Sequence, residues 1–218
     1  MGFIPIRLLS GVPDRSVVDR FLARWSLLAS LTLFASGCHS IPPVDTKPLD
    51  SAGMTYDSIR QLAALEITTS EVAQIATARA SGLSDQTCVA LFKIFRDRRQ
   101  TFDAGDDAAG LFRAQVSENT ILELARLNQL GLSAGEFQAM RLAGLSDATV
   151  LAVARHRALN QPVLSGASLA GLKNAGVRES TLLELARRGV PDSKASEITS
   201  FRRHGGSDAE ILGRFTGS

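Results

Sequence analysis

Residues 172–187, LKNAGVRESTLLELAR, form one copy of a repeated segment that occurs twice more in the chain without gaps. The other two copies are residues 111–126, LFRAQVSENTILELAR, and residues 140–155, MRLAGLSDATVLAVAR. All three have an alanine in the fourth position, a polar pair shortly before a threonine, and an apolar stripe that ends in Ala-Arg. Weaker copies begin near residues 67, 83, 132 and 206. Self-similarity at short intervals is typical of repeat proteins.

Each copy contains the signals that end one helix and begin another. Gly144 is suited to the left-handed conformation that terminates a helix, and we expect the same of Gly176. Ser146 is placed to cap the following helix, and Asp147 puts a negative charge in its first turn. Leu145 precedes the cap, where an apolar side chain fastens the turn to the new helix. The repeat therefore predicts a helix, a tight turn and a second helix.

The spacing of these junctions predicts the fold class. Junctions near residues 67, 83, 116, 132, 145, 177, 190 and 206 are about 13 to 16 residues apart, or multiples of that, so the helices contain about 9 to 15 residues. Helices this short are not stable alone and must bury their apolar stripes against one another. We predict an all-α domain of helix-turn-helix repeats, arranged as a small α-solenoid or as a compact helical bundle.

The repeats predict a domain that covers residues 54–218. Before it, Pro42, Pro43, Pro48 and Gly53 interrupt any apolar periodicity, so residues 38–53 are interpreted as an extended tether. Within the domain, residues 101–107, TFDAGDD, are interpreted as a loop between helices. Their acidic cluster lacks the spaced ligands and the distal glutamate of a calcium-binding EF-hand loop.

The N-terminal segment has the three parts of an export signal. Arg20 and Arg24 precede an uncharged apolar run at residues 25–35, WSLLASLTLFA, and the small residues before Cys38 complete the pattern. The run is too short for a transmembrane helix, which needs about 20 apolar residues. The pattern predicts a signal peptide that ends just before Cys38.

Ala35-Ser36-Gly37-Cys38 resembles the lipobox of bacterial lipoproteins, although that family usually has leucine where this chain has Ala35. The resemblance implies cleavage between Gly37 and Cys38, removal of residues 1–37, and attachment of fatty acids such as palmitate to Cys38. The membrane is then a partner through the lipid anchor. His39 is not the aspartate that retains such proteins in the inner membrane, which favours the outer membrane, facing the periplasm. The alternatives are an ordinary secretory signal or a buried helix with a chance cysteine.

The charge balance argues against nucleic acid as a partner. Four of the 24 Lys and Arg residues and two of the 22 Asp and Glu residues lie in residues 1–37, which leaves 20 of each downstream. A neutral exported domain lacks the basic footprint of nucleic-acid binding. Residues 172–177 faintly resemble a helix-hairpin-helix turn, but Glu179 lies near the place where a second glycine is expected.

Four basic residues occupy equivalent places in the repeats: Lys93, Arg126, Arg155 and Arg187. They are a candidate face for an anionic partner. The alternative is that they only complement the negative ends of helices and keep the domain soluble. Arg157, outside this set, is expected to be exposed and without structural consequence.

We find no catalytic motif and predict no enzyme activity, no cofactor and no metal site. The three histidines, His39, His156 and His204, are not at ligand spacing from one another. Cys88 lies in an apolar helical pattern and is either a small buried residue or a reactive thiol.

These observations favour an envelope lipoprotein whose helical repeats bind or scaffold a protein or cell-wall partner. Two alternatives remain open. The first is a structural envelope protein without a specific ligand, and the second is an enzyme whose site is assembled from dispersed residues.

Overall fold

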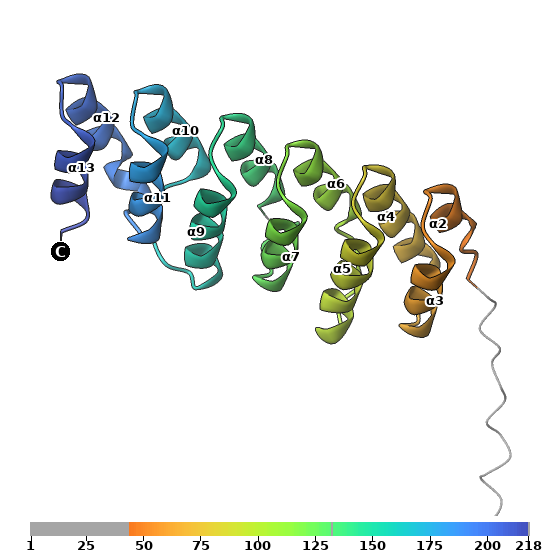
Figure 1. The fold of residues 1–218 in the computed structure, drawn as a ribbon. Helices are drawn as coiled ribbons and strands as arrows, with labels where there is room; N and C mark the ends of the chain where they lie inside the picture. Colours follow the sequence, from red (N-terminus) through yellow and green to blue (C-terminus); the bar gives the residue numbers. More distant parts are fainter. Residues whose placement is uncertain (1–43, 132, 218) are drawn as a thin grey trace, which may run out of the picture. The chain divides into compact units, whose positions relative to one another are not determined.

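The computed structural model describes residues 44–131 and 133–217, in which the chain forms short α-helices and no strand (Figure 1). The α-helices are α2 (Lys47–Ser51), α3 (Tyr56–Ala64), α4 (Thr69–Ala80), α5 (Asp85–Asp97), α6 (Gly105–Arg113), α7 (Glu118–Arg126), α8 (Ala134–Leu142), α9 (Asp147–Ala158), α10 (Gly166–Asn174), α11 (Glu179–Arg187), α12 (Ala195–Arg203) and α13 (Asp208–Phe215), and a 3-10 turn, η1 (Asp192–Lys194), precedes α12. The predicted all-α class is confirmed.

Consecutive helices form hairpins, and the hairpins stack into two layers. The A layer contains α2, α4, α6, α8, α10 and α12, and the B layer contains α3, α5, α7, α9, α11 and α13. Within each layer a helix packs against the helix of the next hairpin (Figure 1). In the described part of the chain, every substantial contact between helices lies within one hairpin or between neighbouring hairpins. This is the stacking of an α-solenoid, the first of the two expected arrangements.

The turn between α8 and α9 has the predicted construction, and the turn between α10 and α11 shares its left-handed glycine. Gly144 and Gly176 have φ angles of 78° and 89°, the left-handed conformation that glycine adopts without steric cost. Ser146 caps α9, because its hydroxyl accepts a hydrogen bond from the Thr149 N–H. The residues that cap the B-layer helices are 29, 33, 29, 32 and 29 residues apart. The structural repeat is therefore a hairpin of about 30 residues.

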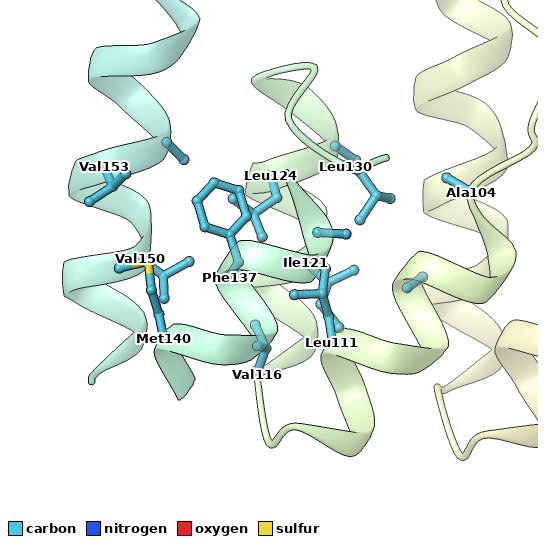
Figure 2. Packing of buried hydrophobic residues seen from close by; sticks show 14 of the residues in the cluster. Ala104, Leu111, Val116, Ile121, Leu124, Leu130, Phe137, Met140, Val150 and Val153 are labelled. Atoms are coloured by element: carbon cyan, nitrogen blue, oxygen red, sulfur yellow. The ribbon is translucent and has the colours of Figure 1, made fainter. Parts of the chain in front are cut away.

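The core lies between the two layers and continues from hairpin to hairpin. Val150 and Val153 of α9 point toward Phe137 and Met140 of α8, and all four side chains are fully buried (Figure 2). Each such side chain contributes about 1.5–3 kcal/mol when it leaves water. Leu145 is also fully buried at the turn that joins these two helices. Because each stripe is covered partly by its own hairpin and partly by the next, no hairpin is complete alone.

Two A-layer helices approach each other closely at a glycine. A side chain on Gly105, at the start of α6, would place its first carbon 2.1 Å from the backbone oxygen of Gln74 in α4. The N–H of Gly105 donates to the side-chain oxygen of Gln74 at 2.8 Å. Glycine is therefore required at this position, because any larger residue would push α4 and α6 apart.

The structure corrects the predicted tether. Residues 38–53 were expected to be extended, but Lys47–Ser51 form α2, and Leu49 is fully buried against the stack. Pro48 stands in the first turn of this helix, where proline is tolerated because the N–H it lacks would have no intrahelical partner. Gly53 then forms the left-handed turn of the first hairpin, with φ of 78°. The packed array thus begins before residue 54.

Two smaller expectations were also wrong. Residues 101–107 are not all loop, because α6 begins at Gly105 and takes Asp106 and Asp107 into its first turn, where negative charge is favourable. Arg157 is half-buried instead of exposed, and its guanidinium pairs with Glu136 of α8. It therefore joins α9 to α8 and is no neutral surface position.

Candidate functional site

The first residue of five B-layer helices is acidic, and these carboxylates join neighbouring hairpins. We call them the carboxylate ladder: Asp85, Glu118, Asp147, Glu179 and Asp208. Each accepts a hydrogen bond from the backbone N–H of the residue that caps the B-layer helix of the preceding hairpin. The acid predicted to complement its own helix therefore also caps its neighbour.

Glu179 shows the geometry of one rung. Its carboxylate accepts the Ser146 N–H at 2.8 Å and the Thr149 hydroxyl at 2.7 Å, both from the preceding hairpin. Burial alone would raise the pKa of Glu179, but these hydrogen bonds outweigh it and hold the pKa below its ordinary value. The carboxylate is therefore ionised at neutral pH, and its hydrogen bonds are made within the protein.

Basic side chains near the ends of A-layer helices complete the ladder. These residues are Arg79, Arg141, Lys173 and Arg202. Arg141 donates to the carbonyl of Leu145 at 2.5 Å and, in the preceding hairpin, to the carbonyl of Gln115 at 2.8 Å. Its Nε also lies 3.1 Å from Asp147. In the third hairpin the equivalent residue is Phe112, so that rung has no such cation.

The four basic residues singled out from the sequence lie together on a different surface. We call Lys93, Arg126, Arg155 and Arg187 the basic row. They follow their helix caps at the same distance in α5, α7, α9 and α11, which are consecutive neighbours in the B layer. All four side chains are exposed. Of the four residues of the basic row, Arg126 alone forms an ion pair with a described residue, Glu123 of its own helix. Whether the row binds an anionic partner stays a prediction.

A row of aliphatic side chains runs beside the basic row. One helical turn before each basic residue stands a half-buried aliphatic residue, which places the two rows on the same side of each helix. This aliphatic row comprises Val89, Leu122, Leu151 and Leu183, and Leu212 continues it on α13. The outer face of the B layer thus combines exposed cations with recessed apolar side chains.

Between α9 and α11 this outer face is hollowed into a groove of about 370 Å³. Its lining residues are Ala148, Leu151, Ala152, Arg155, His156 and Arg187. Leu151, Ala148 and Ala152 provide an apolar surface, and Arg155 and Arg187 bring two members of the basic row to the same cavity. The lining contains no carboxylate.

His156 fixes one end of this groove. Its Nε2 lies 3.0 Å from the carbonyl oxygen of Arg187, which can only accept, so Nε2 carries a proton and donates. Gly189, with φ of 65°, leaves room for the ring, because a side chain there would begin 2.7 Å from the His156 ring carbon Cε1. Sequence reasoning missed this role because the partners of His156 lie more than 30 residues away.

No known protein family matches this chain. Comparisons with characterised proteins and with solved structures also give no match. The candidate site is therefore defined by its own geometry alone.

The other candidate residues from the sequence, Cys88 and the possible metal ligands, form no site among the described residues. Burial raises the pKa of the Cys88 thiol to about 12, and the side chain is fully buried, so the interpretation as a small core residue is favoured over a reactive thiol. In residues 44–131 and 133–217 no three His, Cys, Asp or Glu residues cluster as metal ligands, and no helix could span a membrane. Gly37 and Cys38 lie outside the described residues.

Proposed function

We propose that this chain is a lipid-anchored protein of the bacterial envelope whose helical repeats bind a partner through the outer face of the B layer. The observation that supports binding is the basic row. Lys93, Arg155 and Arg187 are exposed and form no ion pair with any described residue. Cations that neighbouring acids do not neutralise are available to an anionic partner.

The competing explanation is that the row only complements helix dipoles. Helix α3 has no basic residue in its last turn, and Ala64 occupies the row's position there. Every helix from α4 to α13, in both layers, has a basic residue in its last turn, so helix ends account for the positions of Arg126, Arg155 and Arg187. Lys93, however, lies before the last turn of α5, whose last-turn base is Arg96, so the row keeps its place on the B-layer face where the helix end does not require it.

The anchor in this proposal rests on the lipobox-like residues 35–38, which lie outside the described residues. A lipid at Cys38 would hold the array close to a membrane, most simply the outer membrane on its periplasmic side. There the outer face of the B layer can meet a protein or a component of the cell wall. In a purely structural envelope protein these cations would serve only the helix ends and solubility.

Photo-crosslinking in intact cells tests the binding face. A photoreactive amino acid replaces Ser180 on the B layer or, as a matched control, Ala167 on the A layer; both side chains are exposed. We expect a discrete adduct from position 180 only, and its loss when the four residues of the basic row are changed to glutamate. Digestion of the cell wall before electrophoresis separates a cell-wall adduct from a protein adduct.

Equal adducts from both positions, or an adduct from position 180 that survives charge reversal of the row, would contradict this proposal. No adduct from either position would favour a structural protein without a specific ligand.

A further inference from the structure

We infer that the groove between α9 and α11 binds an acidic protein segment, in which an Asp or Glu side chain stands beside an aliphatic one. This inference rests on the proposed function and assigns the partner's chemistry and its site. The carboxylate would lie between Arg155 and Arg187, and the aliphatic side chain would cover Leu151. Guanidinium groups match carboxylates in geometry as well as in charge.

The charges around the groove support an anionic occupant. Arg155 and Arg187 line it from adjacent helices, and neither forms an ion pair within the described residues. The acid on the same outer face of α11, Glu184, is already paired with Arg188 at 2.8 Å. An entering carboxylate would therefore meet two available cations and no competing carboxylate in the lining.

Two small residues of α9 shape this groove. Ala148 and Ala152 occupy positions where α7 has the larger Asn119 and Glu123. Their size leaves Leu151 accessible as an apolar surface. A cavity of about 370 Å³ is at the small end of the range of about 300–1,000 Å³ for ligand sites, which fits a few side chains better than a large cofactor.

The apolar surface extends beyond the groove. Leu159, which follows Leu151 by two helical turns at the end of α9, is 67% exposed. An exposed leucine beside Arg155 gives a segment with alternating acidic and aliphatic side chains a second apolar contact. This apolar component favours a protein segment over a simple phosphate or sugar acid.

A bilayer is the less suitable occupant of this face. Proteins that lie on a membrane insert large apolar side chains that project from a continuous helix face. Here the aliphatic row is half-buried beneath the cations, and only Leu159 projects near the groove. A recessed apolar surface between projecting cations suits side chains that reach in from a partner.

To test this, short random peptides displayed on phage are selected for binding to the full chain in detergent. The affinity of the selected peptides for the chain is then measured by fluorescence anisotropy. We expect enrichment of Asp or Glu next to Leu, Ile or Val. Binding should weaken at least ~10-fold in Arg155→Glu/Arg187→Glu, because two favourable charges become repulsive. Ala148→Tyr should weaken it similarly by filling the groove without any change of charge.

The matched control is Arg113→Glu/Arg203→Glu, which makes the same charge change at two exposed A-layer positions and should leave the affinity unchanged. Absence of acidic enrichment, or equal binding by the groove variants and wild type, would overturn the inference. Phosphatidylglycerol vesicles that bind wild type but not Arg155→Glu/Arg187→Glu, with no peptide selected, would assign the site to a membrane and also overturn it.

This inference and the proposed function can fail separately. A crosslink from position 180 that persists in Arg155→Glu/Arg187→Glu would leave the binding face in place and place the partner outside the groove. Peptides that bind in the groove in vitro, without any crosslink from position 180 in cells, would support the groove's specificity for acidic segments and contradict the proposed function.

Discussion

Removing one rung of the carboxylate ladder should loosen two hairpins at once. We choose Glu179, since its carboxylate accepts from Ser146 N–H at 2.8 Å and from the Thr149 hydroxyl at 2.7 Å, and lies 3.7 Å from Lys173. Glu179→Ala leaves the N–H at the start of α9 and a fully buried threonine without their shared acceptor. The variant changes α11 in sequence but should destabilise α9.

The expected magnitude follows from those contacts. A hydrogen bond to a charged group contributes about 1.5–3 kcal/mol when well buried. Glu179 retains 32% of its side-chain exposure, so water can partly replace it and the lower end applies. We therefore expect Glu179→Ala to lower the free energy of unfolding by about 2 kcal/mol. For a protein of this size that shifts the unfolding midpoint by about 4–8 °C.

Far-UV circular dichroism during heating measures this shift in the purified chain. The matched control is Glu184→Ala, which removes only the ion pair with Arg188 at the C-terminal end of α11 and no hydrogen bond to another hairpin, and should cost less than about 0.5 kcal/mol. A double-mutant cycle with Thr149→Val isolates the contact between hairpins, and we expect a coupling of about 1 kcal/mol. A cost for Glu179→Ala no larger than for Glu184→Ala, or a coupling near zero, would refute the role given to the ladder.

Four further predictions follow from particular residues. Gly144→Val should lower the unfolding midpoint by the equivalent of at least about 1 kcal/mol, since φ is 78° there, whereas Gly135→Ala in open space on α8 should be neutral or stabilising. The ladder carboxylates have folded-state pKa values below their ordinary ones, so they stabilise the fold fully above their unfolded-state pKa values, near pH ~4. This stabilisation is lost as the pH falls through the folded-state pKa values, and measuring the unfolding midpoint at decreasing pH should show the loss. Cys88 should resist iodoacetamide in the native chain and react after denaturation, as mass spectrometry would show. Cys38→Ala should abolish fatty-acid labelling, and a wild-type chain without an acyl mass increment would exclude the lipoprotein interpretation.

The turns could be predicted from sequence because their chemistry is local. A glycine that ends one helix and a serine that caps the next are separated by one residue, so Gly144 and Ser146 were identified together. The same local reasoning failed at Pro48, because proline is as compatible with the first turn of a helix as with a tether. Only the burial of Leu49 against the next hairpin distinguishes the two.

The site could be predicted only in part, because its contacts cross from one hairpin to the next. The equivalence of Arg155 and Arg187 was visible in the repeats, but not that α9 and α11 are neighbours. The groove further depends on Ala148 and Ala152, which look like ordinary helix residues in the sequence. Arg157 was misjudged for the same reason, since Glu136 precedes it by 21 residues.

Acidic first residues and basic last-turn residues had the same explanation in the sequence, since both complement a helix dipole. The structure separates them. Each acid of the carboxylate ladder is bound by the N–H of the preceding hairpin, so the stacking of repeats accounts for its recurrence. The basic row recurs on four consecutive B-layer helices without any comparable bond between hairpins. Stacking therefore explains the acids, whereas the cations that stacking leaves unused are the basis for the binding face that we propose on the B layer.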